Sequence, residues 1–563
     1  MMTDMKSVRR KIDKVAGDYS LNTVFLLGGL LAFVFFILVY GVRVLDPQYD
    51  AWLFNGLNHE DLMQHYSGWL FYRKSSWHFP LFTLMDDINY PNLLPVVFTD
   101  SIPLFAVTFK ILSPLLPATF QYFGIYGALS YYLLGGFSAV IIYRLTGSKV
   151  YSAITSLFCS ASILMLIRVF WHTSLSAHWI VVACIYMMLF KEKEWKVGKS
   201  AFYWGLMIFF AVSIHPYFVP FVAASLVFSL IILSVEDDKP CYKKIFIDIL
   251  VFAAVLFSLY VLLGYNYGAV KNHGLYLGIY SFNYNGFFNT FGYSMLFNGL
   301  PAIHWGQYEG YCYLGFPIYV ILAVTVILHL RARDTEALFP KKKRIVLIVY
   351  SIAFIVFAGS NVLSFGDHYI KVPLPRFILS LWSLFRATGR MIWPVFYLLI
   401  MVIMSSFYKH IKKKRIAILA CILCLSLQMM EYLPEIMTVH NCYSVHHEEY
   451  APFEDNRWEK ISSEYEHICI CSGFLDIYSD YDVKDHCLDL ELFAYRNDMT
   501  INVSFYARDN YSENVEADVE AMFASGELPE DTLFVFLDGE ERPDTDLNYY
   551  ELDGILIGLK ETL

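Results

Sequence analysis

The stretch that decides the fold is LNTVFLLGGLLAFVFFILVYGVRV, residues 21–44. A run of roughly 20 apolar residues is long enough to cross a bilayer. No small-residue cleavage site follows it, so we expect a retained anchor rather than a signal peptide. Positive residues stay on the cytoplasmic side of a membrane, so we expect the N-terminus inside and the next loop outside. The basic residues that precede the run are Lys6, Arg9, Arg10, Lys11 and Lys14.

The composition extends this interpretation to most of the chain. Of the 563 residues, 57% are hydrophobic, and the mean hydropathy is +0.46. Apolar runs fill the first three quarters, whereas the last stretch is polar and acidic. We predict a cytoplasmic N-terminus at 1–20, a polytopic membrane domain at 21–436 and an extracytoplasmic domain at 437–563. The net charge of −10 and the lack of a basic stripe argue against nucleic acid as a partner.

The apolar runs predict about eleven transmembrane helices. Residues 102–116 are short and interrupted by prolines, so we expect an interfacial or re-entrant helix there. With that choice, nearly all basic clusters fall on one side of the membrane, and the C-terminal domain lies outside. The expected spans are roughly 21–44, 121–143, 150–169, 177–190, 201–214, 218–235, 245–263, 314–330, 345–358, 391–407 and 416–432.

The C-terminal region predicts a small α/β domain. Residues 468–471 and 532–537 are typical of strands, and residues 513–525 of an amphipathic helix. Its cysteines lie outside, where one or two disulfides can form, although the spacing does not give the pairing. These cysteines are Cys442, Cys469, Cys471 and Cys487.

The first outside loop, residues 46–120, is too polar to cross a bilayer and rich in aromatic residues. On a short helix Asp61, Gln64 and His65 lie at i, i+3 and i+4 and share a face. A carboxylate backed by these groups can act as a general base or hold a divalent cation such as Mg²⁺ or Mn²⁺, and Arg73 can pair with phosphate. The alternative is an interfacial helix with a satisfied polar face.

Further candidates stand at the outer ends of the expected spans. Asp100 is either a helix cap or a second acid beside the same cavity. His172, His178 and His215 each resemble interfacial histidines, but all three are expected on one face.

The two later outside loops add groups suited to sugars and phosphates. Gln307 and Glu309 lie among aromatic residues, which suits sugar binding. Arg386 and Arg390 suit a phosphate, with snorkelling anchors as the alternative.

These features together resemble the GT-C superfamily of integral-membrane glycosyltransferases, and more closely an uncharacterised bacterial GT-C-like multi-spanning family. The resemblance covers about residues 20–435. It is carried by Asp61 through Gln64-His65, Gly68-Trp69, Phe71 and Arg73 to Trp77-His78-Phe79-Pro80, by Val97-Phe98-Thr99-Asp100-Ser101-Ile102-Pro103, Phe120-Gln121-Tyr122-Phe123-Gly124 and Leu175-Ser176-Ala177-His178-Trp179, and by His215-Pro216-Tyr217 and Gln307-Tyr308-Glu309-Gly310.

The resemblance implies a polyprenyl-phosphate-linked sugar donor, used on the outer face of the cytoplasmic membrane, and a cell-envelope acceptor. It gives Asp61 the role of base or metal ligand. The chain has Glu60-Asp61 where protein mannosyltransferases have Asp-Glu, which leaves open which acid faces the site. It lacks the Trp-Trp-Asp motif of oligosaccharyltransferases, so protein N-glycosylation is not expected. A flippase of lipid-linked glycans and a non-enzymatic membrane scaffold are the alternatives.

Overall fold

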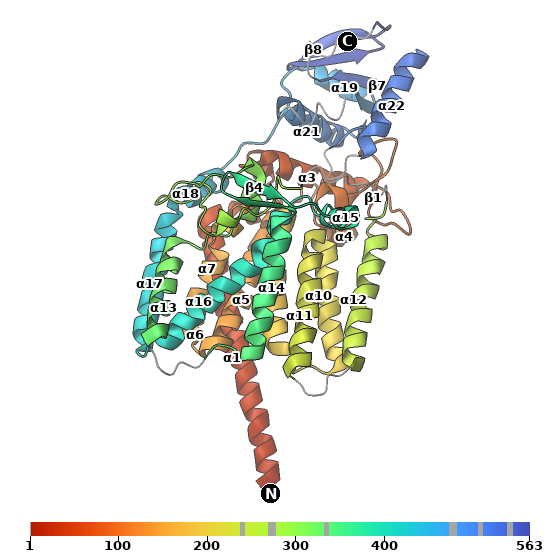
Figure 1. The fold of residues 1–563 in the computed structure, drawn as a ribbon. Helices are drawn as coiled ribbons and strands as arrows, with labels where there is room; N and C mark the ends of the chain where they lie inside the picture. The colour runs from red at the N-terminus through yellow and green to blue at the C-terminus, as the bar shows by residue number, and fades with distance from the viewer. Residues whose placement is uncertain are drawn as a thin grey trace.

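Helices form one bundle, and a smaller mixed domain lies beyond one end of it (Figure 1). The structure is a computed structural model. It describes residues 2–236, 242–267, 277–331, 337–471, 481–504, 510–537 and 544–563.

Within these residues seven helical segments are long and apolar enough to cross a membrane, or eight if one bent pair forms a single span. The bent pair is α17 (Lys414–Glu431) and α18 (Leu433–Tyr443), which meet at 65°. The seven are Tyr19–Tyr40 in α1 (Met2–Tyr40), α5 (Phe123–Thr146), Thr173–Lys191 around α9 (Trp179–Tyr186), α10 (Val197–Ile214), Pro216–Glu236 around α11 (Val219–Glu236), α12 (Tyr242–Leu262) and Thr388–His410 around α16 (Trp393–His410).

This number is lower than the eleven expected, for identifiable reasons. The stretch predicted as a span at 150–169 is broken into α6 (Lys149–Thr155), α7 (Leu157–Ser160) and α8 (Ile163–Leu166). At the breaks, side-chain hydroxyl groups donate hydrogen bonds to backbone carbonyls. For example, Ser162 Oγ donates to the Cys159 carbonyl at 2.8 Å. Of the other predicted spans, α13 (Phe316–Arg331) has 16 residues, and α14 (Lys341–Gly359) begins with the basic run KKKR.

The loop at residues 46–120, predicted to lie outside the membrane, is at the end of the bundle that carries the C-terminal domain (Figure 1). Its α4 (Pro103–Leu112) is too short to count as a candidate span, as the prolines of this stretch predicted. The hairpin of β3 (Val362–Phe365) and β4 (His368–Lys371) and the helix α15 (Arg376–Trp382) lie at the same end. The elements of the first loop are α2 (Ala51–Phe54), α3 (His59–Lys74), β1 (Leu84–Met85), β2 (Leu94–Pro95) and α4 (Pro103–Leu112).

The C-terminal domain is α/β, as predicted. Its strands are β5 (His467–Ile470), β6 (Thr500–Ile501), β7 (Thr532–Phe536), β8 (Asn548–Leu552) and β9 (Ile555–Leu559), in the spatial order β6-β5-β7-β9-β8. The central β5 pairs in parallel with β6 and β7, and β9 pairs antiparallel with β7 and β8. Cys442, Cys469 and Cys487 are free thiols, so the disulfides considered for these three are not formed. The elements are α19 (Arg457–Glu464), β5 (His467–Ile470), α21 (Tyr481–Arg496), β6 (Thr500–Ile501), α22 (Asn510–Ser525), β7 (Thr532–Phe536), β8 (Asn548–Leu552) and β9 (Ile555–Leu559).

Candidate functional site

The helix α3 carries the first two acid–base candidates. Asp61 and His65 are four residues apart, so both lie on one face. The side chain of Asn58, at the N-cap, donates to Asp61 Oδ2 at 2.7 Å and to the Trp171 carbonyl at 3.0 Å, instead of capping the helix. The N-terminus of α3 is therefore bonded to Asp61 and to the Trp171 carbonyl instead of being capped by its own N-cap side chain.

The segment around Asp100 packs directly on α3. A Cβ added at Gly68 would lie 2.1 Å from Thr99 Oγ1, so only glycine permits this approach. Ser101 Oγ donates to the His65 carbonyl at 2.7 Å. Asp100 has φ 55°, in the left-handed region that non-glycine residues rarely adopt. Strained backbone of this kind persists where the surrounding structure fixes it, and it is concentrated at functional sites.

Asp61 and Glu60, between which the sequence leaves the choice open, point to different partners. Asp61 Oδ2 lies 2.7 Å from His172 Nδ1, inside the membrane domain. Glu60 instead pairs with Lys484 on α21 of the C-terminal domain. Asn58 and His172 both contact Oδ2 of Asp61, and Oδ1 has no partner among the described residues.

Glu309 lies at the centre of a buried ionic cluster. Arg390 binds it with two hydrogen bonds, of 2.9 Å from Nε and 2.7 Å from an amino group, and Arg168 donates to the same carboxylate. His172 Nε2 lies 3.4 Å from Glu309 Oε1. The helix η8 (Trp305–Gly310) packs closely on η9 (Thr388–Ile392), which brings Arg390 to Glu309. This close approach requires glycine at position 389, because a Cβ at Gly389 would lie 2.8 Å from the Gly310 nitrogen.

The remaining contacts link Arg390 to a second Asp–His pair. The guanidinium of Arg390 lies 4.6 Å from the centre of the Tyr217 ring, and that ring lies 5.3 Å from the ring of His215. His215 Nε2 lies 3.3 Å from Asp100 Oδ1. We call this set the outer ring: Asp61, His65, Asp100, His172, His215, Tyr217, Glu309 and Arg390.

The two Asp–His pairs of the outer ring differ in their proton arrangement. His215 Nδ1 accepts a hydrogen bond from the Tyr217 backbone N–H at 3.1 Å, so Nε2 carries the proton donated to Asp100. Both nitrogens of His172 face carboxylates, which favours the imidazolium.

The pKa shifts agree with this arrangement. Burial lowers the pKa of His172. The charge of Asp61 and the hydrogen bonds to Asp61 and Glu309 outweigh burial and raise the pKa of His172 above its ordinary value. Burial opposes ionisation of Asp61, yet His172 holds the pKa of Asp61 below its usual range. The charges of Arg168 and Arg390 likewise overcome burial and hold the pKa of Glu309 well below its usual range.

Comparison with models of known protein families identifies the family of this chain. The family model described as a domain of unknown function, DUF6311, matches residues 29–432. The chain belongs to the DUF6311 family. A second model, the DUF6311 C-terminal domain, matches residues 457–560. The chain matched none of the curated proteins compared with it. All residues of the outer ring fall inside the first match.

Some residues predicted for the site have other roles in this DUF6311 chain. Gln307 is buried and bonded to Asn283, Ser281 and Ser364, so it holds its own loop together. Arg73 donates to Ser113 Oγ at 2.7 Å and to carbonyls at 116–118, which ties α3 to the end of α4.

Three other predicted residues lie beside the outer ring. His178 is fully buried against Trp393, with Nδ1 2.6 Å from Tyr397 Oη, and so does not join the ring. Gln64 is half-buried on α3. Arg386 is exposed and lies over the Tyr280 ring at 4.9 Å.

Sequence reasoning missed Arg168 and Tyr217. Arg168 is completely buried, and its Nε and one terminal nitrogen have no partner among the described residues. The sequence did contain a sign of it, because Arg168 is a lone charge inside the run predicted as a span at 150–169. Ionisable residues inside a membrane span are energetically costly and commonly functional. Tyr217 was part of a noted motif, but its contact with Arg390 joins segments far apart in the sequence.

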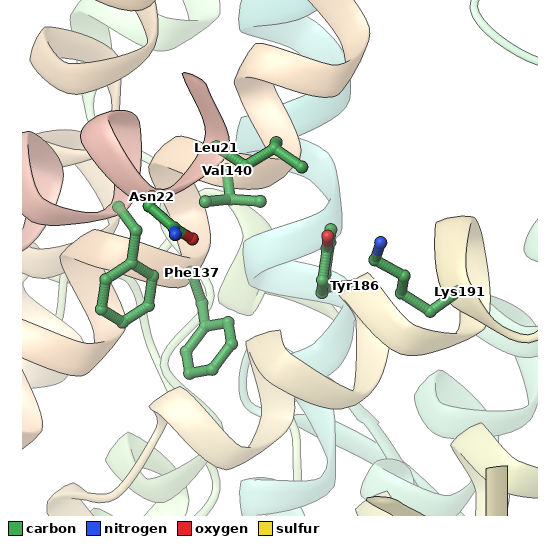
Figure 2. A pocket seen from close by; sticks show the side chains of 7 residues that line it. Leu21, Asn22, Phe137, Val140, Tyr186 and Lys191 are labelled. Carbon is green, nitrogen blue, oxygen red and sulfur yellow. The ribbon is translucent and has the colours of Figure 1, made fainter. Parts of the chain in front are cut away.

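A pocket lies at the opposite end of the DUF6311 domain (Figure 2). It has a volume of about 250 Å³ and lies between α1, α5 and the end of the Thr173–Lys191 segment. Its lining is mostly apolar, with few polar groups, and it contains none of the outer-ring residues. The lining residues are Leu21, Asn22, Phe25, Phe137, Val140, Tyr186 and Lys191.

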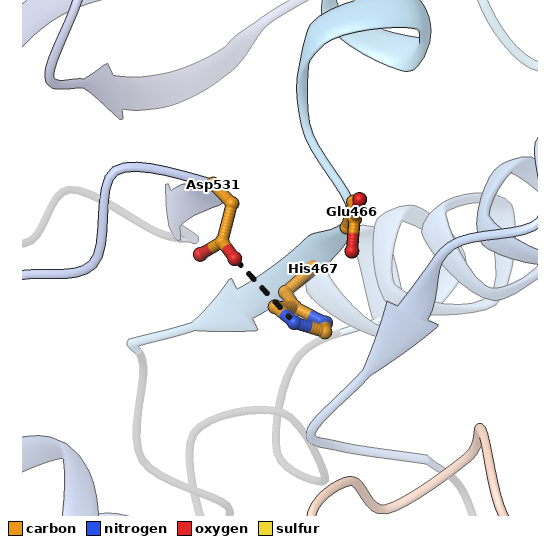
Figure 3. Close-up of side chains that lie close together, drawn as sticks. All are labelled: Glu466, His467 and Asp531. Carbon is orange, nitrogen blue, oxygen red and sulfur yellow. Dashed lines mark ion pairs between the residues drawn. The ribbon is translucent and has the colours of Figure 1, made fainter.

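One possible metal-binding group lies in the DUF6311 C-terminal domain (Figure 3). Ligand atoms of Glu466, His467 and Asp531 lie within 4.8 Å of one another. The ring of His467 also stacks on Tyr90 at 4.7 Å, and its Nδ1 lies 2.8 Å from Thr500 Oγ1. These contacts give His467 a structural role between the two domains.

Proposed function

We propose that the protein is a membrane glycosyltransferase that transfers a sugar from a polyprenyl-phosphate donor to an acceptor hydroxyl at the outer ring. The observation that carries the proposal is the Asp61 carboxylate, which His172 and Asn58 hold through one oxygen while the other is left for a substrate proton. A positioned carboxylate of this kind is what a general base requires.

The cations of the ionic cluster suit a phosphate. Three cations, Arg168, His172 and Arg390, face the carboxylates of Asp61 and Glu309, and Asp100 adds a third carboxylate to the outer ring. Arg168 keeps two nitrogens without a partner among the described residues, and guanidinium donors of this kind suit a phosphate.

An exposed apolar face near the cluster offers a path for the lipid tail. Phe377, Leu381 and Leu384 are 63–68% exposed on and after α15. Arg386 follows directly and is also exposed. A donor phosphate at Arg386 would leave its tail against this apolar face.

The sugar itself would lie against aromatic rings. Trp305 is 73% exposed, and its ring lies 6.3 Å from the Tyr308 ring, nearly parallel to it. Tyr308 precedes Glu309 directly, so a sugar stacked here would lie beside the ionic cluster. This assigns sugar contact to the rings rather than to Gln307, whose amide is already engaged.

The reaction then has three steps at named atoms. Asp61 Oδ1 takes the proton of the acceptor hydroxyl. The acceptor oxygen attacks the anomeric carbon with inversion, and the bond from that carbon to the phosphate oxygen breaks. Polyprenyl phosphate leaves with the bonding electrons, and the guanidinium groups of Arg168 and Arg390 stabilise it.

The membrane topology completes the proposal. With the N-terminus cytoplasmic, an odd number of crossings, about eleven, places the outer ring and the C-terminal domain on the outer face of the cytoplasmic membrane. The broken segment α6–α8 and the shorter α13 and α14 would supply the crossings beyond the seven or eight long helices.

A transfer assay tests the proposal. Purified protein in liposomes receives radiolabelled polyprenyl-phosphate sugars and a cell-envelope extract, and label in the acceptor is measured. Wild type should transfer label, and Asp61→Asn should lower the rate at least about 100-fold, the typical contribution of a general base. Movement of the labelled lipid between leaflets without transfer would contradict the proposal and indicate a flippase.

A further inference from the structure

The C-terminal domain contacts the helix that carries Asp61. The helix α21 packs against α3, and three ion pairs join the domains: Lys484 with Glu60, His59 with Asp485 at 3.1 Å, and Lys74 with Asp498. Phe71, buried on α3, also meets the ring of Tyr495 at 5.8 Å.

The first outside loop also extends the C-terminal sheet. Ile88 forms a parallel bridge with Ile501 on β6, the edge strand of that sheet. The Ile501 N–H donates to the Asp87 carbonyl, and the Tyr90 N–H donates to the Ile501 carbonyl, each at 2.9 Å. An unpaired sheet edge is a natural docking surface, and here the membrane domain fills it.

Two faces of α3 therefore serve two domains. Glu60 and Phe71 are eleven residues apart, about three helical turns, and both face the C-terminal domain. Asp61 and His65 lie about 100° further round and face the membrane domain. Since the N-cap side chain of Asn58 is used on Asp61, the first turn of α3 has no local cap, and contacts from outside the helix must fix its rotation.

We propose that α21 is a positioning element for Asp61, acting through the Lys484–Glu60 and Asp485–His59 pairs at the first turn of α3. The inference rests on the proposed function for its kinetic consequence only. Lys484 and Glu60 are 18% and 14% exposed, so their pair is shielded from solvent and more effective than a surface ion pair.

The test reverses one charge and then restores the pair. Lys484→Glu should raise amide hydrogen exchange in the first two turns of α3 about tenfold and lower kcat for sugar transfer by about tenfold or more, because small displacements of a catalytic group are costly. KM for the lipid donor should be unchanged. The double variant Glu60→Lys/Lys484→Glu should recover most of both values.

Lys560→Glu is the matched control, because it breaks a pair with Asp546 inside the same domain and away from α3. It should leave exchange in α3 at the wild-type level. Unchanged exchange in α3 in both Lys484→Glu and the milder Lys484→Ala would overturn the proposal, whatever the enzyme assay gives. If wild type transfers no sugar, the proposed function fails, while the exchange measurement still decides the positioning role.

Discussion

Two buried charged clusters lie at opposite ends of the membrane domain, and they are built differently. At the end away from the C-terminal domain, Glu192 accepts from Ser200, Trp204 and Lys244, and Lys244 also donates to the Trp195 carbonyl at 3.1 Å. Glu192 and Lys244 are both buried. This inner cluster joins three helical segments and also holds Asp248, which is fully buried. Asp248 Oδ2 accepts from Ser200 at 2.7 Å, whereas its Oδ1 has no partner among the described residues.

The outer ring has the same kinds of residues but is more open to solvent. Asp61, His172 and Asp100 are about one-quarter exposed, and His65 Nδ1 and two nitrogens of Arg168, which binds Glu309, have no partner in the described part of the chain. Buried polar groups normally find partners, so unpaired ones at a partly open site indicate a place for a ligand. The difference teaches that neither burial of charge nor a single unpaired atom marks a functional site, whereas partial exposure combined with several unused donors does.

The largest stability effect should come from Glu309→Gln. The change removes the carboxylate shared by Arg168 and Arg390, and removing one partner of a buried ion pair costs about 3–5 kcal/mol. We expect a clear drop in the thermal unfolding midpoint in detergent and loss of sugar transfer. Glu192→Gln, the counterpart in the inner cluster, should also be destabilised, but its remaining folded fraction should keep its kcat.

A medium effect should come from Gly68→Ala. The added methyl group has no room beside Thr99 Oγ1, and overpacking of this kind costs about 1–3 kcal/mol. Gly198→Ala is the control, because no atom lies within 4 Å of the added Cβ and the position starts a helix. Unfolding midpoints of the two variants should differ clearly. Equal midpoints would mean that Gly68 does not set the approach of the Asp100 segment.

The smallest effect should be the pH dependence of the His172–Asp61 pair. The folded pKa of Asp61 is lowered from 3.8, so its contribution to stability is complete above that value and is lost as the pH falls through the lower folded pKa. The folded pKa of His172 is raised from 6.5, so its contribution is complete below 6.5 and is lost as the pH rises through the higher folded pKa.

The stability difference between wild type and His172→Gln should therefore be largest between pH 3.8 and 6.5 and shrink on the alkaline side. Unfolding midpoints measured across this range for both proteins provide the check. A difference that grows above pH 7 would contradict an imidazolium at His172.

Local pattern predicted a good part of this molecule. The i, i+3, i+4 spacing on α3 selected Asp61 and His65, and the two strand-like runs predicted the α/β domain. What local pattern lacks is the identity of distant partners. Glu60 and Asp61 are equivalent neighbours in sequence, and only Lys484 and His172 distinguish them.

The errors have similar physical causes. Hydropathy predicted one continuous helix at 150–169, but buried hydroxyl groups satisfy the backbone at its breaks. The environment of Gln307 looked like a sugar site because it is aromatic, yet Asn283 and Ser364 already occupy its amide.

The most direct test of the central claim is to compare the initial rate of sugar transfer for wild type, Asp61→Asn and Glu192→Gln in the same liposomes, each normalised to folded protein. The account predicts a loss of at least about 100-fold for Asp61→Asn and a rate within about twofold of wild type for Glu192→Gln. Equal losses in both variants, or full activity of Asp61→Asn, would contradict the assignment of the chemistry to the outer ring.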